Sequence, residues 1–388
     1  MVGASHVTEV DTVVRGPGLT LDPQHPLSRA LRRAVADALV SFVDGQGPAL
    51  RAVGPELEPV LALAHQALSG GKRLRPGFFV WSYLAAGGDT EQLPAVIRAA
   101  ASLELLHVSA LVHDDVMDAS DLRRGAPAAH RLFEALHVDS SWLGDPPTFG
   151  RSGAILLGDL LLMWSVQMLQ RSELPPAALE RALPVVEAMR AEVTCGQYLD
   201  VVAQAQPLHA GPERGAEIGR ALDEASRVVE YKSARYTVLR PCQAGAAAAD
   251  ASAELTEALA AYGSPLGRAF QFRDDLLGVF GDPQLTGKPA GDDLREGKRT
   301  VLVAHAIAGA DARGRELLGR RLGDPTLDEA GVVELQDVIT ASGAREEVEA
   351  MIAAGHRQAI RALADADLTS AGRTALTALA DLAVRRES

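Results

Sequence analysis

The chain has 388 residues, of which 47% are hydrophobic and 4% aromatic, and it carries a net charge of -13. This acidic balance argues against a nucleic-acid partner, and Cys195 and Cys242 are too few for a disulfide framework, so we expect a protein of the reducing cytoplasm. No uninterrupted run of about 18 apolar residues occurs, so we expect no membrane-spanning helix. The dominance of Ala, Leu and Val favours an all-α fold.

The N-terminal part of the chain changes character near residue 26. Residues 1–26 are rich in Gly, Pro and His and have no apolar period, which predicts a flexible N-terminal extension. We expect one domain over residues 27–388. Its first amphipathic segments end at residue 68. The loop "SGGKRLRP", which contains three basic residues, follows them.

The middle of the chain is expected to be helical. The segment from Leu93 to about Ser120 is apolar nearly all round, which predicts a buried central helix with acids in its last turns. The stretch "LHVDSSWLGDPPTFGRSG" is typical of a loop. Further helices are expected over residues 154–170, 177–203, 216–239, 253–280 and within 301–386. Between residues 280 and 301, the stretch "PQLTGKPAGDDLREGKRT" is dense in Gly, Pro and charged residues, which predicts a mobile functional loop.

The stretch "HDDVMDASDLRRG" combines acids and bases at the end of the central helix. Asp114 and Asp118 are four residues apart and share a helix face, with Asp115 alongside. Buried carboxylates are costly unless they are paired or coordinated, and one or two carboxylates per ion is the usual arrangement for Mg²⁺. Taken alone, this motif could equally be a solvated acidic helix end.

A second acidic pair, Asp274 and Asp275, also lies near the end of an apolar helix, with Gln271 one turn earlier. Like charges at intermediate dielectric repel by about 4 kcal/mol per close pair, so two such ends facing each other would need divalent ions between them. The chain also offers cations for an anion: Lys72, Arg73, Arg75, Arg123, Arg124, Lys232, Lys288 and Lys298. A diphosphate would satisfy both demands by bridging Mg²⁺ and accepting guanidinium hydrogen bonds.

These residues lie in a set of motifs with a fixed order. They are "GGKRLRP", "LLHVSALVHDDVMDASDLRRGAPAAH", "GDLLL", "GQYLD", "YKSA", "AFQFRDDLLGVFGD" and "GKPAGDDLREGKRT". With this set the chain resembles the trans-isoprenyl diphosphate synthases of the polyprenyl synthetase family, and most of all the bacterial geranylgeranyl diphosphate synthases. The resemblance implies a helical bundle around a deep central cavity, a homodimer, and condensation of isopentenyl diphosphate with dimethylallyl, geranyl or farnesyl diphosphate.

The resemblance also implies roles for individual residues. Asp114 and Asp118 match ligands of two Mg²⁺ ions, Asp115 supports them, and Asp274 matches the ligand of a third ion. The positions that match the isopentenyl diphosphate site are Lys72, Arg75, His107 and Arg124. Those that match the allylic diphosphate site are Arg123, Lys232 and Lys288, with Lys298 and Gln271 beside them. Singly, each could be an ordinary surface charge or a core histidine; together they favour the functional interpretation.

Two features of the motifs bear on the chemistry. Gly278 stands where the family commonly has a third aspartate, with Asp282 one turn further on, and we expect this loss to weaken an outer contact without abolishing catalysis. Ser109 and Ala110 precede Asp114 by about one turn and are small, so the resemblance implies an open cavity and a product of twenty carbons or longer, geranylgeranyl diphosphate first. The alternatives are a longer-chain product, or small residues that only allow close helix packing.

Three other functions stay open at this point. A terpene cyclase would share the first aspartate motif but would need no "GGKRLRP" site. A metal phosphohydrolase could use His113 and Asp114, although His65, His107, His130 and His137 show no ligand spacing. A catalytically silent partner subunit of the same fold is the non-enzymatic alternative.

Overall fold

The computed structural model describes residues 13–206, 214–282, 291–324 and 326–385. Lys288, expected at the allylic site, lies outside these residues. In the N-terminal half the elements are β1 (Val14–Gly16), β2 (Leu19–Leu21), α1 (Arg29–Asp44), α2 (Gly47–Val53), η1 (Pro55–Leu57), α3 (Glu58–Leu68), α4 (Leu74–Ala85), η2 (Thr90–Gln92), α5 (Leu93–Met117), β3 (Leu122–Arg123), β4 (Ala126–Pro127), α6 (Ala129–Asp139) and α7 (Pro146–Gln170).

The C-terminal half is helical throughout its described part. Its elements are α8 (Pro176–Ala205), α9 (Arg214–Val228), η3 (Val229–Leu239), α10 (Arg240–Ala248), α11 (Ala253–Phe280), α13 (Asp292–Glu296), α14 (Val301–Gly309), α15 (Ala312–Arg321), α16 (Glu329–Ala341), α17 (Ala344–Ala364) and α18 (Ser370–Val384). The expected all-α fold is confirmed, and the β-structure in the described residues is limited to two short antiparallel hairpins.

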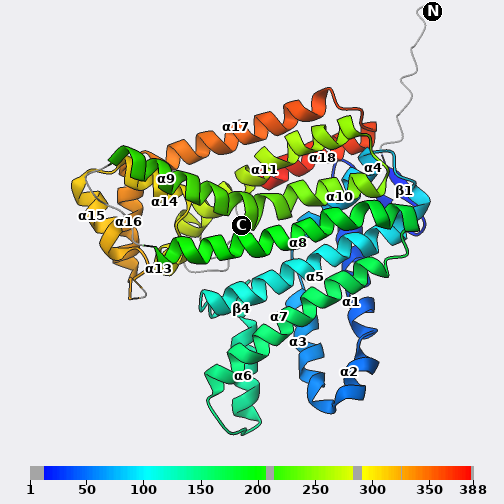
Figure 1. Cartoon of the computed structure of the whole chain (residues 1–388), viewed down its shortest axis with the longest axis horizontal. Helices are drawn as coiled ribbons and strands as arrows, with labels where there is room; N and C mark the ends of the chain where they lie inside the picture. Colours follow the sequence, from blue (N-terminus) through cyan, green and yellow to red (C-terminus); the bar gives the residue numbers. More distant parts are fainter. Residues whose placement is uncertain (1–12, 207–213, 283–290, 325, 386–388) are drawn as a thin grey trace, which may run out of the picture.

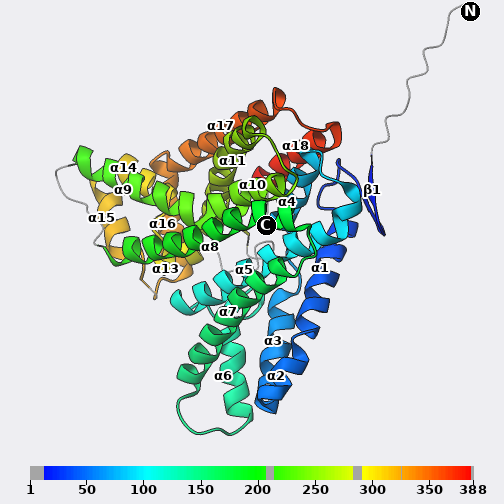
Figure 2. The same cartoon turned by 45° about the vertical axis from the view of Figure 1, so that its right-hand side comes forward.

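Helix α5 is the centre of the bundle. It is buried over most of its length, and it packs most closely against α7, while α11 packs against α17 and η3. Figures 1 and 2 show α5, α7, α8 and α10 running alongside one another, with α6 and α1 to α3 extending from the body and α13 to α16 gathered at one end. The buried apolar side chains form one continuous core.

Residues 13–26 are folded, although they were expected to belong to a flexible extension. Residues 13–26 include the hairpin of β1 and β2, whose Leu21 is fully buried, and the indole nitrogen of Trp81 donates a hydrogen bond to the carbonyl of Pro26 (2.9 Å). The expectation of a flexible segment is therefore wrong for residues 13–26, which pack on the bundle. Short strands lack the length that would make a period-2 pattern visible in the sequence.

The start of α7 also differs from the expectation of a loop up to residue 153. The Asp145 carboxylate accepts a hydrogen bond from the backbone nitrogen of Thr148 (3.0 Å), and Pro146 and Pro147 occupy the first turn. Both are N-terminal helix signals, so the two prolines open a helix here instead of marking a loop. By contrast, α11 spans the expected residues 253–280, with Ser252 as its N-cap.

Two helices are long and apolar enough to cross a membrane by length and composition alone. One includes α5, in which 78% of the most apolar window is buried inside the bundle. The other is α7, in which 44% of that window is buried. More than half of this apolar window of α7 is therefore not buried within the chain.

Candidate active site

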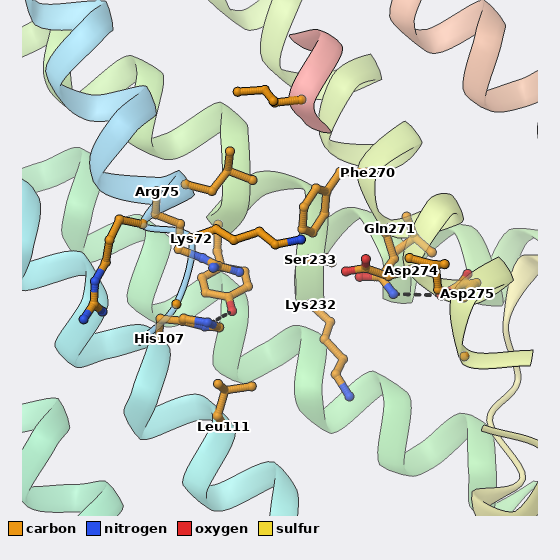
Figure 3. Close-up of a pocket in the computed structure, with 18 of the residues that line it drawn as sticks. Lys72, Arg75, His107, Leu111, Lys232, Ser233, Phe270, Gln271, Asp274 and Asp275 are labelled. Carbon is orange, nitrogen blue, oxygen red and sulfur yellow. Dashed lines mark hydrogen bonds between the residues drawn. The ribbon is translucent and has the colours of Figure 1, made fainter. Parts of the chain in front are cut away.

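A cavity of about 1430 Å³ opens between α4, α5, η3, α11 and the segment around α13. Figure 3 shows Lys72, Arg75 and His107 on one side of it and Gln271, Asp274 and Asp275 on the other, with Lys232 between them. The structure thus brings the acidic ends of α5 and α11 and most of the predicted cations to the same cavity. The sequence left open whether the two acidic ends face each other, and in the structure both line one cavity.

Asp114 is held in the cavity by groups from two other elements. Its Oδ1 accepts hydrogen bonds from Nε2 of Gln197 (2.9 Å) and from Nζ of Lys232 (3.1 Å), and Lys232 also bonds to Oδ2 of Asp200 (2.6 Å). Burial alone would raise the pKa of Asp114, but the positive charges of Lys232 and Lys298 hold that pKa well below its usual range. Asp114 is therefore ionised and ready to coordinate a cation.

The neighbouring aspartates of α5 are also paired with cations. Oδ2 of Asp118 lies 3.0 Å from Nζ of Lys298, and burial raises the pKa of this carboxyl. Oδ1 of Asp115, which is buried, accepts hydrogen bonds from Nε (2.9 Å) and Nη2 of Arg123. Arg123 and Lys298 thus contact the acidic cluster directly, which adds to the substrate role expected of them.

The second acidic cluster is on the opposite wall, at the end of α11. Nε2 of Gln271 donates to Oδ1 of Asp275 (2.7 Å), so the Gln271 side chain orients a carboxylate in this structure. Oδ2 of Asp275 is buried without a hydrogen-bond partner, and burial raises the pKa of this carboxyl to about 8. A cation bound beside Asp275 would satisfy this acceptor and lower its pKa.

The donor set fits Mg²⁺. All the candidate ligands, Asp114, Asp118 and Asp274, offer carboxylate oxygens, which Mg²⁺ prefers, and the cavity also holds the unpartnered Oδ2 of Asp275. Within the described residues, no three His, Cys, Asp or Glu side chains come close enough to form a metal cage by themselves.

The basic side of the cavity is organised by Tyr236 of η3. Its hydroxyl lies 2.8 Å from Nδ1 of His107, and the guanidinium of Arg75 stacks 4.0 Å above its ring. Arg75, expected in a loop, lies in the first turn of α4, and its Nη2 donates to Oγ1 of Thr237 (2.8 Å). Burial, and then the charge of Arg75, lower the pKa of His107, so this imidazole is neutral at pH 7.

Two further cations complete that side. Lys72 is exposed at the cavity mouth. Arg124 has a left-handed backbone (φ 53°), and its Nη1 donates to the carbonyl of Ser69 (3.0 Å), which brings it to the same loop as Lys72. Arg73 of this loop, by contrast, turns into the core and pairs with Glu104.

Several side chains that hold the catalytic candidates in place had no role predicted from the sequence. Gln197 and Asp200 lie in the quoted "GQYLD", but their contact with Asp114 and Lys232 depends on how α8 meets η3. Element η3 is a π-helix, where one continuous α-helix was expected over residues 216–239. A Cβ on Gly196 would overlap the backbone of Lys232, so only glycine allows this approach. π-Helical turns of this kind are frequent at functional sites.

The two small residues of α5 differ in their surroundings. Ser109 is buried, and its hydroxyl donates to the carbonyl of Gly158 in α7 (2.7 Å). Ala110 is half-buried and lies four residues before Asp114, on the same helix face. His113, the residue that a phosphohydrolase would need, faces the carbonyl of Ile155 in α7 instead (3.1 Å).

Comparison with known proteins is consistent with this geometry. The "Polyprenyl synthetase" family model matches residues 58–339. A short chain isoprenyl diphosphate synthase of Methanothermobacter thermautotrophicus is 32% identical over 84% of this chain and 90% of its own length. A geranylgeranyl diphosphate synthase of Methanosarcina mazei is 34% identical over 62% and 64%.

A solved structure is also similar over nearly the whole chain. It is the geranylgeranyl pyrophosphate synthase of Corynebacterium glutamicum, complexed with isoprenyl diphosphate and magnesium. Its sequence identity to this chain is 40% and the TM-score is 0.86, with 94% of this chain and 100% of that chain covered.

The buried pair of Arg73 and Glu104 should be essential for stability. Nη1 and Oε2 are 2.6 Å apart and both side chains are almost fully buried. We expect Glu104→Gln to lower the free energy of unfolding by about 3–5 kcal/mol, because it leaves the guanidinium buried and uncompensated. Chemical denaturation measures this effect.

Arg98 and Glu173 provide the matched control. They are also 2.6 Å apart, but the Glu173 side chain is 78% exposed. Glu173→Gln should therefore cost no more than about 1 kcal/mol. If both substitutions lowered the free energy of unfolding equally, the prediction that the buried pair matters more than the exposed pair would be wrong.

Proposed function

The chain belongs to the polyprenyl synthetase family and is a prenyltransferase, and we propose that it condenses isopentenyl diphosphate with an allylic diphosphate in a Mg²⁺-dependent reaction. The observation that carries this proposal is the facing of two acidic helix ends across one cavity, with cations on its opposite side. In the reaction the allylic C–O bond breaks, a C–C bond forms to isopentenyl diphosphate, and a proton leaves with the released diphosphate.

The proposed roles are those that the family resemblance implies, and the positions of the described side chains support them. Asp114, Asp118 and Asp274 would hold three Mg²⁺ ions, which neutralise charge on the leaving diphosphate. Lys232 and Lys298, beside Asp114 and Asp118, would bind the same diphosphate. Lys288 and Arg123 complete this proposed set, with Asp115 and Gln271 supporting it.

Isopentenyl diphosphate is assigned to the opposite side of the cavity. The groups proposed to bind it are Lys72, Arg75, His107 and Arg124. The neutral imidazole of His107 can donate one hydrogen bond without adding charge. Leu111 and Phe270 line the cavity between the two sites, where apolar side chains exclude water from the allylic cation.

We propose geranylgeranyl diphosphate as the main product, with Ser109 and Ala110 as the residues that leave the cavity long. The support is the name of the relatives and the small size of both side chains. Ala110 is the better placed of the two, because it shares the face of Asp114, whereas the Ser109 hydroxyl is bonded to α7. A longer product, a terpene cyclase and a silent subunit remain the weaker alternatives.

We further propose that the enzyme is a soluble, cytoplasmic homodimer. The support is the exposed apolar side of α7, where Ile155, Leu156 and Met163 are 44%, 67% and 64% exposed. Burying these side chains against a second copy would remove apolar area from water. Sedimentation of the purified chain as a monomer would contradict the assignment.

The first prediction concerns the metal-binding carboxylates. Asp114→Asn and Asp118→Asn should each lower kcat by at least ~10²-fold, because each removes a charge that stabilises the transition state. Turnover of radiolabelled isopentenyl diphosphate measures this. Asp121→Asn is the control, since Asp121 is 61% exposed and bonded to Arg131, and its kcat should change little. Near-normal kcat in either of the first two variants would refute the metal assignment.

A second prediction separates the two diphosphate sites. Arg124→Lys should raise KM for isopentenyl diphosphate more than KM for the allylic substrate, because an ammonium group cannot replace the planar guanidinium. Steady-state kinetics with each substrate varied in turn tests this. An increase confined to the allylic substrate would reverse the assignment of the sites.

The third prediction concerns product length. Ala110→Phe should shift the product to fifteen carbons at a similar initial rate if Ala110 limits the cavity as proposed, because the ring would then occupy space below Asp114 and the substitution breaks no side-chain hydrogen bond. Chromatography of the products measures the shift. Ser109→Phe should cost stability as well, because it removes the bond to Gly158 and overpacks the contact between α5 and α7. Unchanged products in both variants would show that neither residue sets the length.

A further inference from the structure

Gly278 lies one turn after Asp274 and so belongs to the same face of α11. A side chain at this position would not project into open space. A Cβ built on Gly278 would overlap the carboxylate of Asp293, whose Cγ would be only 2.5 Å away. The carboxylate of Asp293 therefore occupies the place that a larger residue at position 278 would need.

Asp293 is brought there by a constrained turn. It lies in α13, a five-residue helix between Gly291 (φ 71°) and Gly297 (φ 74°), both left-handed. Leu294 anchors the turn, since its side chain is fully buried and its carbonyl accepts a hydrogen bond from Gly323 (2.9 Å). The carbonyl of Asp293 accepts one from the backbone nitrogen of Lys298 (3.0 Å). These contacts hold the backbone at Asp293 in place.

A second observation indicates that a cation belongs at this wall. Asp275 is 3% exposed and lines the same cavity as Asp274 and Asp293, and its Oδ2 has no hydrogen-bond partner. Its other oxygen is used by Gln271. A hydrated divalent ion in this cavity would satisfy the buried acceptor of Asp275 and offset the negative charge of the two other carboxylates that line it.

Building on the function proposed above, we propose that Asp293 supplies the carboxylate that Gly278 leaves out of the second aspartate motif. It would hold, directly or through a bound water, the Mg²⁺ that Asp274 binds on the allylic diphosphate. The third carboxylate of the second aspartate motif then comes from α13 instead of from the next turn of α11. Asp282, which lies two residues beyond the end of α11, is not needed for this role.

The test uses Mg²⁺ and inorganic diphosphate with the full-length protein. Isothermal titration calorimetry would measure the apparent affinity for Mg²⁺ in the presence of diphosphate. Asp293→Asn, which keeps the side-chain shape, should weaken this affinity by at least ~10-fold, the usual cost of removing a group that orients a metal ligand. Asp337→Asn, an exposed acid of α16, is the control and should leave it unchanged.

A relocation variant makes the test specific. Gly278→Asp alone should reduce the melting temperature, because the new side chain overlaps Asp293. The double variant Gly278→Asp with Asp293→Ala removes the overlap and returns a carboxylate to α11, so its Mg²⁺ affinity should recover to within about threefold of the wild-type value. The single variant Asp293→Ala should keep a weakened Mg²⁺ affinity, because it has no carboxylate at either position.

Two outcomes would overturn the proposal. One is wild-type Mg²⁺ affinity in Asp293→Asn, and the other is a folded double variant, by circular dichroism, with no recovery. Failure of the proposed function is distinguished by the wild-type enzyme itself. If it condenses isopentenyl diphosphate while Asp293→Asn binds Mg²⁺ normally, only the role of Asp293 is refuted.

Discussion

Two carboxylates at the inner end of a core helix, those of Asp114 and Asp118, must be kept charged away from bulk water. At intermediate dielectric, two like charges in contact repel by about 4 kcal/mol, so this end of α5 requires cations from its surroundings. Lys232 and Lys298 supply them in the present structure. The irregular backbone elements near the cavity position these two lysines.

Each lysine comes from an irregular element. Lys232 lies in the π-helix η3, which approaches α8 closely because residue 196 is a glycine. Lys298 follows the short turn of α13, which the left-handed Gly291 and Gly297 make possible. Regular helices form the walls of the cavity, and departures from regular geometry direct the charges into it. The cations that balance the acids are thereby also positioned to meet an incoming anionic ligand.

Local signals explain which parts of this arrangement could be predicted from the sequence. The bounds of α11 follow from Ser252 and from the apolar period, and the pairing of Asp114 with Asp118 follows from helix spacing. The partners of Tyr236 could not be found this way, because His107 and Arg75 reach it from other helices. The relation between Gly278 and Asp293 was missed for the same reason. In the sequence alone, the glycine indicates only a missing acid.

The π-helix connects the two ends of the cavity. Tyr236 and Thr237 contact His107 and Arg75 on one side, while Lys232 of the same helix contacts Asp114 on the other. If a ligand bound on one side ordered or shifted η3, it would change the free energy of binding on the other side. Thermodynamic linkage requires that the effect be mutual: the factor by which the first ligand changes the affinity for the second equals the factor in the reverse direction.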